Sequence, residues 1–225
     1  MKIGLIIYPE FSLYEITPLT AQLALNYHQQ VDIIAEEKKC YVSEDGFQVM
    51  PEFAFSQVKW TDYDALFFTG TMKPFETVLN ATMIENLALI NSETTVIAAM
   101  SSSPLILAKA GLIKDRTFTG GIYTNLLSYF SWLNEDKFMD KHCVVDGKLI
   151  TALGTKRGVE EFTNSVLYIL GFLPSLPELS QEKISFTLCN QEFDSLLLAI
   201  KKIIHYNLRR FYDYYWNYSR VQSFS

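Results

Sequence analysis

Cysteine and histidine are both scarce in this chain, with three of each in 225 residues. The cysteines are odd in number and show no paired spacing, which argues against a disulfide framework. No group of histidine, cysteine and acidic residues has the spacing of a metal-binding motif, so we expect no metal and no other cofactor. The scarcity of histidine also removes most candidates for a general base.

The chain also lacks an excess of basic residues and any long apolar run. Its formal net charge is −6 and its pI is near 5.1, which argues against nucleic acid or an anionic membrane as the main partner. The first apolar run, in MKIGLIIYPEF, is too short for a signal peptide, and no stretch long enough to span a membrane follows. With 49% apolar and 20% charged residues, we expect a globular cytoplasmic protein.

Strand and helix signals alternate along the first three quarters of the chain. Continuous apolar runs such as IGLIIY are typical of strands buried on both faces, and prolines at positions 18, 74 and 104 suit the first turns of helices. Two Asp-Gly pairs predict hairpins, CYVS with FQVM and CVVDGKLIT. The predicted strands are 3–8, 31–35, 65–69 and 95–99, and the predicted helices are about 18–27, 74–89, 104–110 and 157–170.

This alternation predicts an α/β fold with a doubly wound, mainly parallel sheet and helices on both faces. In such sheets a ligand binds beyond the carboxyl ends of the strands. Three polar segments lie there in the predicted pattern: residues 8–15, Gly70-Thr71 and residues 100–103. We expect them to meet at one crevice.

The stretch AAMSSSPLILAKAGLI leads from a predicted strand directly into a predicted helix. Such a sharp turn often displays a nucleophile, which makes Ser101 a candidate. A purely structural interpretation is also open, since Ser103 before Pro104 suits a helix N-cap. The start of this helix attracts anions under either interpretation.

The composition changes after residue 173, and we divide the chain into an α/β domain, 1–173, and a C-terminal helical extension, 174–225. Apolar residues recur at helical spacing from Phe193 to Tyr215, which predicts one long amphipathic helix. Its aromatic and arginine-rich end can pack on its own domain, form a dimer interface or cover the crevice. Nucleic-acid binding ranks last among these alternatives because the chain is acidic.

Five stretches, in order along the chain, resemble the ThiJ/PfpI superfamily, whose fold is class I glutamine amidotransferase-like and flavodoxin-like. The resemblance covers roughly Met1 to Phe172 and not the tail. The stretches are YPEFSLYEITPL, SEDGFQVMPEFAFSQV, YDALFFTG, AAMSSSPLILAKAGLI and VVDGKLITALGTKRGVEEFTNSVLYILG.

The resemblance implies site residues but also departures at the pocket. The family's elbow cysteine, in a pattern like A-I-C-A-G-P, corresponds to Ser101, and the acidic residue that hydrogen-bonds it corresponds to Glu15. A histidine that many members place after the elbow helix corresponds to Gly120, which we expect to line the pocket. The family's T-S-R-G-P stretch has become residues 151–155, TALGT. The resemblance therefore implies the fold more firmly than the cysteine chemistry.

The resemblance also implies a pocket that binds oxyanions or carbonyl oxygens. The backbone N–H groups of Gly70 and Thr71 correspond to the family's donors, and Ser102 can add another. Without a histidine, proton transfer from serine to Glu15 faces a gap of roughly nine pKa units, on the order of 12 kcal/mol. Binding is therefore easier to retain than catalysis.

Three classes of function remain open. The first is a pseudoenzyme that binds a small polar metabolite, as a homodimer that can involve the C-terminal helix. The second is a divergent enzyme that uses Ser101 and Glu15, by isonitrile-hydratase-like hydration or by amide or ester hydrolysis. The third is an interaction module that recruits a partner through its aromatic tail.

Overall fold

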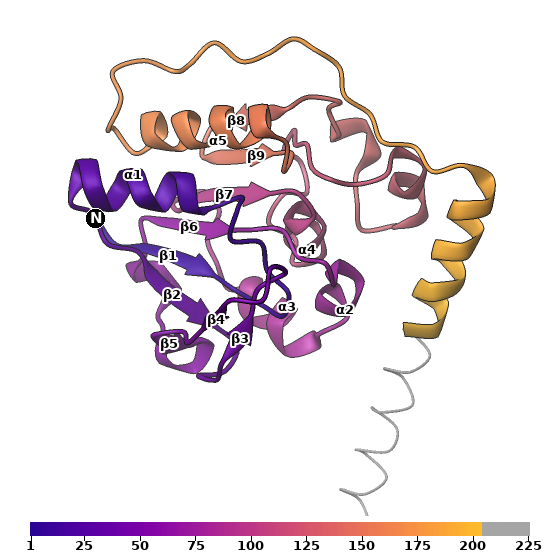
Figure 1. The fold of residues 1–225 in the computed structure, drawn as a ribbon, viewed down its shortest axis with the longest axis horizontal. Coiled ribbons are helices and arrows are strands. Elements are labelled where there is room, and N and C mark those ends of the chain that lie inside the picture. Colours follow the sequence, from indigo (N-terminus) through magenta and orange to yellow (C-terminus); the bar gives the residue numbers. More distant parts are fainter. Residues whose placement is uncertain (204–225) are drawn as a thin grey trace, which may run out of the picture. The chain divides into compact units, whose positions relative to one another are not determined.

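A seven-stranded sheet forms the centre of the computed structural model, which describes residues 1–203 (Figure 1). The strand order is β5-β2-β1-β6-β7-β9-β8, and all neighbours pair in parallel except β9 with β8. The doubly wound α/β prediction is confirmed. The strands are β1 (Ile3–Ile6), β2 (Asp32–Ala35), β5 (Phe53–Ala54), β6 (Ala65–Phe68), β7 (Val96–Met100), β8 (Cys143–Asp146) and β9 (Leu149–Ala152).

The central strands form where the sequence is almost wholly apolar, Thr151 in β9 being the exception. Every residue of β1, β6, β7 and β9 is buried, because helices cover both faces of the sheet. Phe68 pairs with Ala99, and Met100 pairs with Ala152, so β6, β7 and β9 end side by side. The loops that follow these three strands therefore meet at one edge of the sheet.

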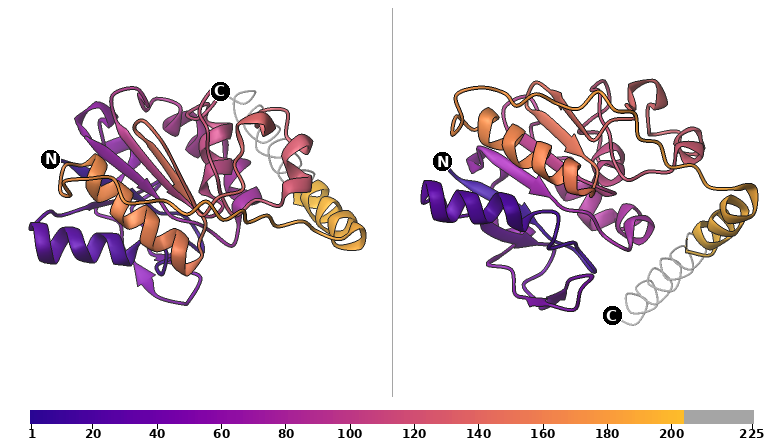
Figure 2. Two further views of the ribbon diagram at one scale, coloured as in Figure 1. Left: turned by 90° about the horizontal axis from the view of Figure 1, so that it is seen from above. Right: turned by 45° about the horizontal axis from the view of Figure 1, so that its top comes forward.

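Five helices cover the sheet in two groups. Helices α1 (Thr17–Tyr27) and α5 (Lys156–Ile169) pack beside each other, and α2 (Pro74–Val78) and α3 (Ala81–Leu87) pack with α4 (Ser103–Lys109). Figures 1 and 2 show these groups on opposite faces of the sheet. Proline lies in the first turn of α1, α2 and α4, where a missing N–H costs no helical hydrogen bond.

Both predicted hairpins are present, but one predicted helix is wrong. Strands β3 (Tyr41–Val42) and β4 (Gln48–Val49) form a separate two-stranded sheet, and β8 with β9 form the second hairpin. The single helix expected over 74–89 is two helices, because the Asn80 side chain accepts the Met83 N–H and caps α3. Strand β5 and four short 3₁₀ segments were not predicted: η1 (Phe55–Gln57), η2 (Trp60–Asp62), η3 (Thr124–Tyr129) and η4 (Glu135–Lys137).

The chain divides into two compact units, Met1–Thr187 and Leu188–Ser225. In the second unit residues 190–203 are helical, as expected for the extension, and the remainder of the helix predicted to reach Tyr215 lies outside the described residues. The domain boundary at 173/174 stays a prediction. No helix within residues 1–203 is both long and apolar enough to cross a membrane.

Candidate functional site at the β7–α4 elbow

Ser101 forms a sharp turn between β7 and α4. Its φ is 53°, in the left-handed region that a non-glycine residue enters only at an energetic cost. Two backbone hydrogen bonds hold it there: the Ser101 N–H donates to the Ala152 carbonyl at 2.7 Å, and the Ser101 carbonyl accepts the Gly121 N–H at 2.7 Å. The side chain remains half-buried while its neighbours are buried. The turn therefore presents one hydroxyl group at the edge of the sheet.

The serine predicted to cap the helix is the wrong one. Ser102 occupies the N-cap position of α4 and Ser103 is the first helical residue. The Ser103 hydroxyl donates toward carbonyl oxygens of Met100 and Phe68, at 2.6 and 3.2 Å, instead of accepting a backbone N–H. The Ser103 hydroxyl thus links the elbow to the ends of β6 and β7.

Glu15 is buried against the elbow. Its Oε2 accepts the Gly70 N–H at 2.7 Å and lies 3.4 Å from the Thr69 hydroxyl, and the Ser101 side chain lies close enough to favour its charged form. Burial raises the pKa of Glu15 above its usual value; the hydrogen bonds from Gly70 and Ser101 oppose this rise, and the charge of Glu44 adds to it. The structure thus joins the two residues that the resemblance had paired.

The two carboxyl oxygens of Glu15 have different surroundings. Because Oε2 accepts the Gly70 N–H, a proton on neutral Glu15 belongs on Oε1. A Cβ atom added to Gly154 would lie 2.2 Å from Oε1 and 3.5 Å from the Ser101 Oγ. Oε1 therefore lies beside the serine hydroxyl, and protonated Glu15 would act there as a hydrogen-bond donor.

We expect Glu15→Gln to stabilise the protein at neutral pH. Because the folded-state pKa of Glu15 is raised, its contribution to stability is present below the unfolded-state pKa and is lost as the pH rises through the folded-state pKa. Glutamine fills the same space, accepts the Gly70 N–H and carries no charge. The expected gain at pH 8 is about 1 kcal/mol, or ~2–4 °C in Tm.

Calorimetry of wild type and Glu15→Gln at pH 8 and pH 4 tests this expectation. The difference in Tm between the two proteins should shrink at pH 4, because protonation makes the wild-type Glu15 uncharged, like glutamine. A variant that is less stable than wild type at pH 8, or equally shifted at both pH values, would contradict it.

The backbone N–H groups expected to bind a ligand already have acceptors within the protein. The Gly70 N–H donates to Glu15, and the Thr71 N–H donates to the Ser102 Oγ at 3.0 Å. The Ser102 hydroxyl in turn donates to the Thr71 carbonyl at 3.1 Å. The role of Gly70, Thr71 and Ser102 toward a ligand stays a prediction, and it requires these groups to exchange partners.

Two glycines close the other side of the elbow. A Cβ added to Gly120 would lie 2.7 Å from the Ser101 carbonyl oxygen and 3.0 Å from the Pro104 Cγ, so this backbone leaves no room for a histidine there. A Cβ at Gly121 would lie 3.0 Å from the Ser101 Oγ. Gly121 is exposed, whereas Gly120 is buried. The turn 120–121 therefore shapes the open side of the serine hydroxyl.

Tyr8 and Thr69 form a buried polar layer next to the carboxyl group. The Tyr8 hydroxyl donates to the Thr69 carbonyl, and the Thr69 hydroxyl donates to the Ser12 carbonyl. Burial, and secondarily the charge of Glu15, raises the pKa of Tyr8 well above its usual value. Tyr8 is therefore a neutral donor that fixes the β6 loop, not a base for the serine.

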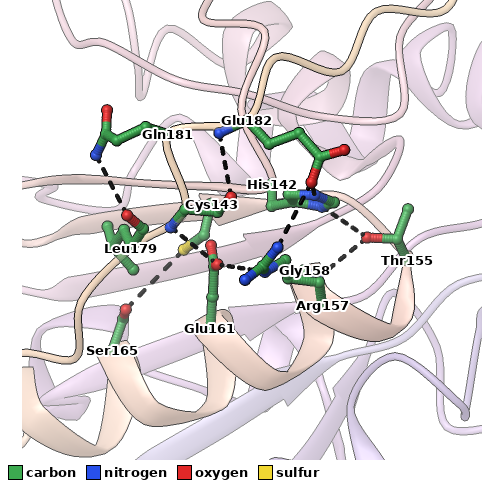
Figure 3. Close-up of polar contacts among 11 residues, drawn as sticks. His142, Cys143, Thr155, Arg157, Gly158, Glu161, Ser165, Leu179, Gln181 and Glu182 are labelled. Atoms are coloured by element: carbon green, nitrogen blue, oxygen red, sulfur yellow. Dashed lines mark hydrogen bonds and ion pairs between the residues drawn. The ribbon is translucent and has the colours of Figure 1, made fainter.

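No histidine within residues 1–203 contacts Ser101. His28 lies at the exposed end of α1, and the His142 ring lies near Thr155 and Glu182 (Figure 3). The third histidine, His205, lies outside the described residues. In the described part of the chain Ser101 thus has a carboxyl partner but no imidazole partner.

Neither free cysteine of the first unit, Cys40 or Cys143, lies at the elbow. Cys40 and Cys189 are exposed, and Cys143 is buried at the start of β8 with its sulfur 4.0 Å from the Ser165 hydroxyl. Burial raises the pKa of the Cys143 thiol to about 12, which keeps it protonated and unreactive. Residues 1–203 also contain no group of three or more histidine, cysteine and acidic side chains placed to hold a metal ion.

Thr69, Gly121 and Gly154 belong to the site as well, and sequence reasoning assigned none of them a role. Gly121 and Gly154 lie in stretches where the chain departs from the family pattern, which was the available signal. Both leave space for the Ser101 side chain: a Cβ added to Gly121 would crowd Ser101 Oγ at 3.0 Å, and one added to Gly154 would touch it at 3.5 Å. Thr69 has no signal beyond its place at the end of a strand.

Comparison with known proteins agrees with the fold. The model of the DJ-1/PfpI family matches residues 1–168. The chain is 27% identical over 140 residues to the deglycase PfpI of Pyrococcus furiosus, covering 58% of this chain and 81% of that protein.

Solved structures show the same fold at low identity. A DJ-1 superfamily protein of Agrobacterium tumefaciens superposes with a TM-score of 0.66 at 20% identity, over 77% of this chain and 92% of that one. A two-domain protein of Anabaena variabilis, with DJ-1/ThiJ/PfpI-like and ferritin-like domains, has a TM-score of 0.66 at 17% identity. That match covers 81% of this chain but only 54% of the two-domain protein.

Proposed function

Because this chain belongs to the DJ-1/PfpI family, we propose that its elbow binds a small polar ligand at Ser101 and Glu15 without cysteine chemistry. In this proposal Ser101 stands where the family places its cysteine. The observation that carries the proposal is the environment of Glu15, a buried carboxyl group whose Oε2 accepts the Gly70 N–H and whose Oε1 lies on the Gly154 side, near the Ser101 hydroxyl. When protonated, this carboxyl group is a hydrogen-bond donor beside a serine hydroxyl, and its raised pKa widens the pH range in which that form is present.

The pair suits a ligand with a carbonyl or carboxylate oxygen. Ser101 Oγ and protonated Oε1 supply two donors at one point, and the exposed Gly121 leaves that side without a side chain. An anionic Glu15 would repel a carboxylate. Binding of a carboxylate should therefore weaken as the pH rises through the pKa of Glu15.

One observation favours a second candidate, hydration or hydrolysis by a Ser101 nucleophile. The left-handed backbone at Ser101 is the kind of strain that accumulates at catalytic turns. A serine nucleophile needs a base, however, and the titratable group placed beside the Ser101 side chain is Glu15. The 27% identical relative is named a deglycase, and at this identity its name does not assign a reaction to the elbow of this chain.

One experiment on wild type and Ser101→Ala separates the two candidates. Melting curves are recorded with two- to four-carbon carboxylates, amides and keto acids at ~10 mM. A ligand with a Kd near ~0.1 mM should stabilise wild type by about 2.7 kcal/mol and Ser101→Ala much less. Intact mass after exposure to a fluorophosphonate is measured on the same two proteins, and we expect no adduct on either.

The outcomes differ for each candidate. A Tm shift that depends on Ser101, without an adduct, supports ligand binding alone. An adduct on wild type that is missing from Ser101→Ala shows an activated serine and favours the enzyme. If wild type shows no Tm shift with any ligand and no adduct, the result contradicts both uses of the elbow.

A further inference from the structure

An extended segment, residues 174–187, follows α5 and is called the strap here. It contains no helix or strand and lies wholly within the first unit. Figures 1 and 2 show it running back along α5 and then toward the segment that carries η3. The strap begins after the last residue that the family model matches, 168.

The first attachment of the strap is to the start of α5. The Ser180 N–H donates to Glu161 Oε1 at 3.0 Å, and Glu182 Oε2 lies 3.5 Å from Arg157 Nη1 (Figure 3). Arg157 Nε also lies 3.3 Å from Glu161 Oε1. Glu161 is buried, and its Oε2 has no hydrogen-bond partner, so the carboxylate depends on Ser180 and Arg157. Detaching the strap would leave a buried carboxyl group with fewer partners, which is energetically costly.

The attachment continues through His142 to the elbow. His142 Nε2 lies 3.4 Å from Glu182 Oε2, and Nδ1 lies 3.1 Å from Thr155 Oγ1 (Figure 3). Thr155 Oγ1 accepts the Gly158 N–H at 3.1 Å, so its own proton can be donated to Nδ1. The Nε2–H is then directed at Glu182. Thr155 directly follows Gly154, which lies against Glu15 Oε1.

The second attachment of the strap is to the turn on the other side of the elbow. The Phe186 carbonyl accepts the Thr124 N–H at 2.7 Å, and the hydroxyls of Thr124 and Thr187 lie 2.7 Å apart. Thr124 begins η3, three residues after Gly121. Gly121 in turn donates to the Ser101 carbonyl. One segment therefore holds both turns that approach the Ser101 hydroxyl.

We propose that the strap is a positioning element for the elbow, with Glu182 and His142 as positioning residues that hold Gly154 against Glu15 and Ser101. The proposal rests on the proposed function only in taking Ser101 and Glu15 as the ligand site. Loss of the Glu182 attachment frees Thr155 and Gly154 to move away from Glu15 Oε1. Water then reaches a carboxyl group that the intact turn keeps dry.

Three variants of the full chain test this proposal. Glu182→Ala removes the attachment, and Glu182→Gln retains an acceptor for His142. The matched control is Glu178→Ala, which removes an exposed glutamate of the same strap that has no hydrogen bond or ion pair within residues 1–203. Two readouts need no ligand: amide hydrogen exchange, and carbon-13 NMR titration of the Glu15 carboxyl, assigned with Glu15→Gln.

In Glu182→Ala we expect exchange in residues 153–155 to become ~5-fold faster, as fits the loss of a partly exposed ion pair and a hydrogen bond. We also expect the pKa of Glu15 to fall toward that of an ordinary glutamate. Glu182→Gln should retain the wild-type titration, and Glu178→Ala should leave both readouts unchanged.

The proposal is overturned if Glu182→Ala speeds exchange only in the strap and leaves the titration of Glu15 unmoved. The strap would then be surface packing. Because neither readout requires a ligand, a failed ligand search at Ser101 would refute the proposed function without affecting this result.

Discussion

Gly158→Ala is expected to lower the free energy of unfolding by about 3 kcal/mol or more, since overpacking and loss of a helix cap add together. A Cβ at Gly158 would lie 2.1 Å from the Leu153 carbonyl oxygen and 3.0 Å from its carbon. Both atoms belong to the backbone, so no side-chain rotation relieves the clash. The usual gain of ~1 kcal/mol from replacing glycine by alanine in a helix is far smaller.

The clash also falls on the N-cap of α5. Gly158 is the third residue of the helix, and its N–H donates to the Thr155 hydroxyl at 3.1 Å. Moving the helix away from Leu153 breaks this bond and shifts the turn that carries Gly154. The midpoint of urea unfolding at 25 °C measures the loss, with an unchanged slope as the sign that the two-state transition persists.

Gly46→Ala is the control for the backbone cost alone. Gly46 lies at the Asp-Gly turn with φ 90° and has nothing within 4 Å of an added Cβ. Alanine there should cost only about 1 kcal/mol. If Gly158→Ala costs no more than Gly46→Ala, the start of α5 is adjustable and the expected clash does not act.

Gly154→Ala is expected to displace Glu15, at a cost of about 2 kcal/mol from overpacking. The added Cβ would lie 2.2 Å from Glu15 Oε1, closer than any real contact. Gly154 does not have a positive φ, so alanine suits its backbone and the penalty comes from the carboxyl group. The carboxyl must turn away from Ser101 and give up the Gly70 N–H.

A double-mutant cycle identifies that cause. In a Glu15→Ala background, Gly154→Ala should cost little, giving a coupling energy of about 1–2 kcal/mol. Gly70→Ala is the contrast, because its Cβ would meet Glu15 Oε2 at 2.6 Å and also Ser101 Cβ at 2.8 Å. Removing Glu15 leaves the second clash in place, so the Gly70→Ala penalty should persist. Equal relief of both variants would argue against the geometry described for Glu15.

The strands of the sheet were predictable because each has a local sequence signal, a short continuous run of apolar residues. The run TVIAA predicted a strand at 95–99, and β7 spans Val96–Met100. A continuous apolar run bounded by polar residues has few alternatives in an α/β chain. Periodicity was misleading where a capping residue interrupts the pattern. Asn80 caps α3 and separates it from α2, whereas the periodic pattern alone predicted one continuous helix.

The candidate site was less predictable because its members meet only through tertiary structure. The pairing of Glu15 with Ser101 came from resemblance, since nothing in their spacing indicates contact. Gly154 lies more than fifty residues from Ser101 in sequence, and its approach to Glu15 depends on the pairing of β7 with β9. The attachments of the strap depend on single polar contacts between segments that have no regular pattern.

The left-handed turn at Ser101 has a consequence for how the sequence can change over time. Glycine would adopt φ 53° without the ~1 kcal/mol that a side chain costs there. Selection for thermal stability alone would therefore replace this serine with glycine, a small residue that also fits the crowded surroundings. Ser101→Gly would therefore remove the hydroxyl while easing the backbone, and a loss of ligand binding in that variant would belong to the hydroxyl and not to strain.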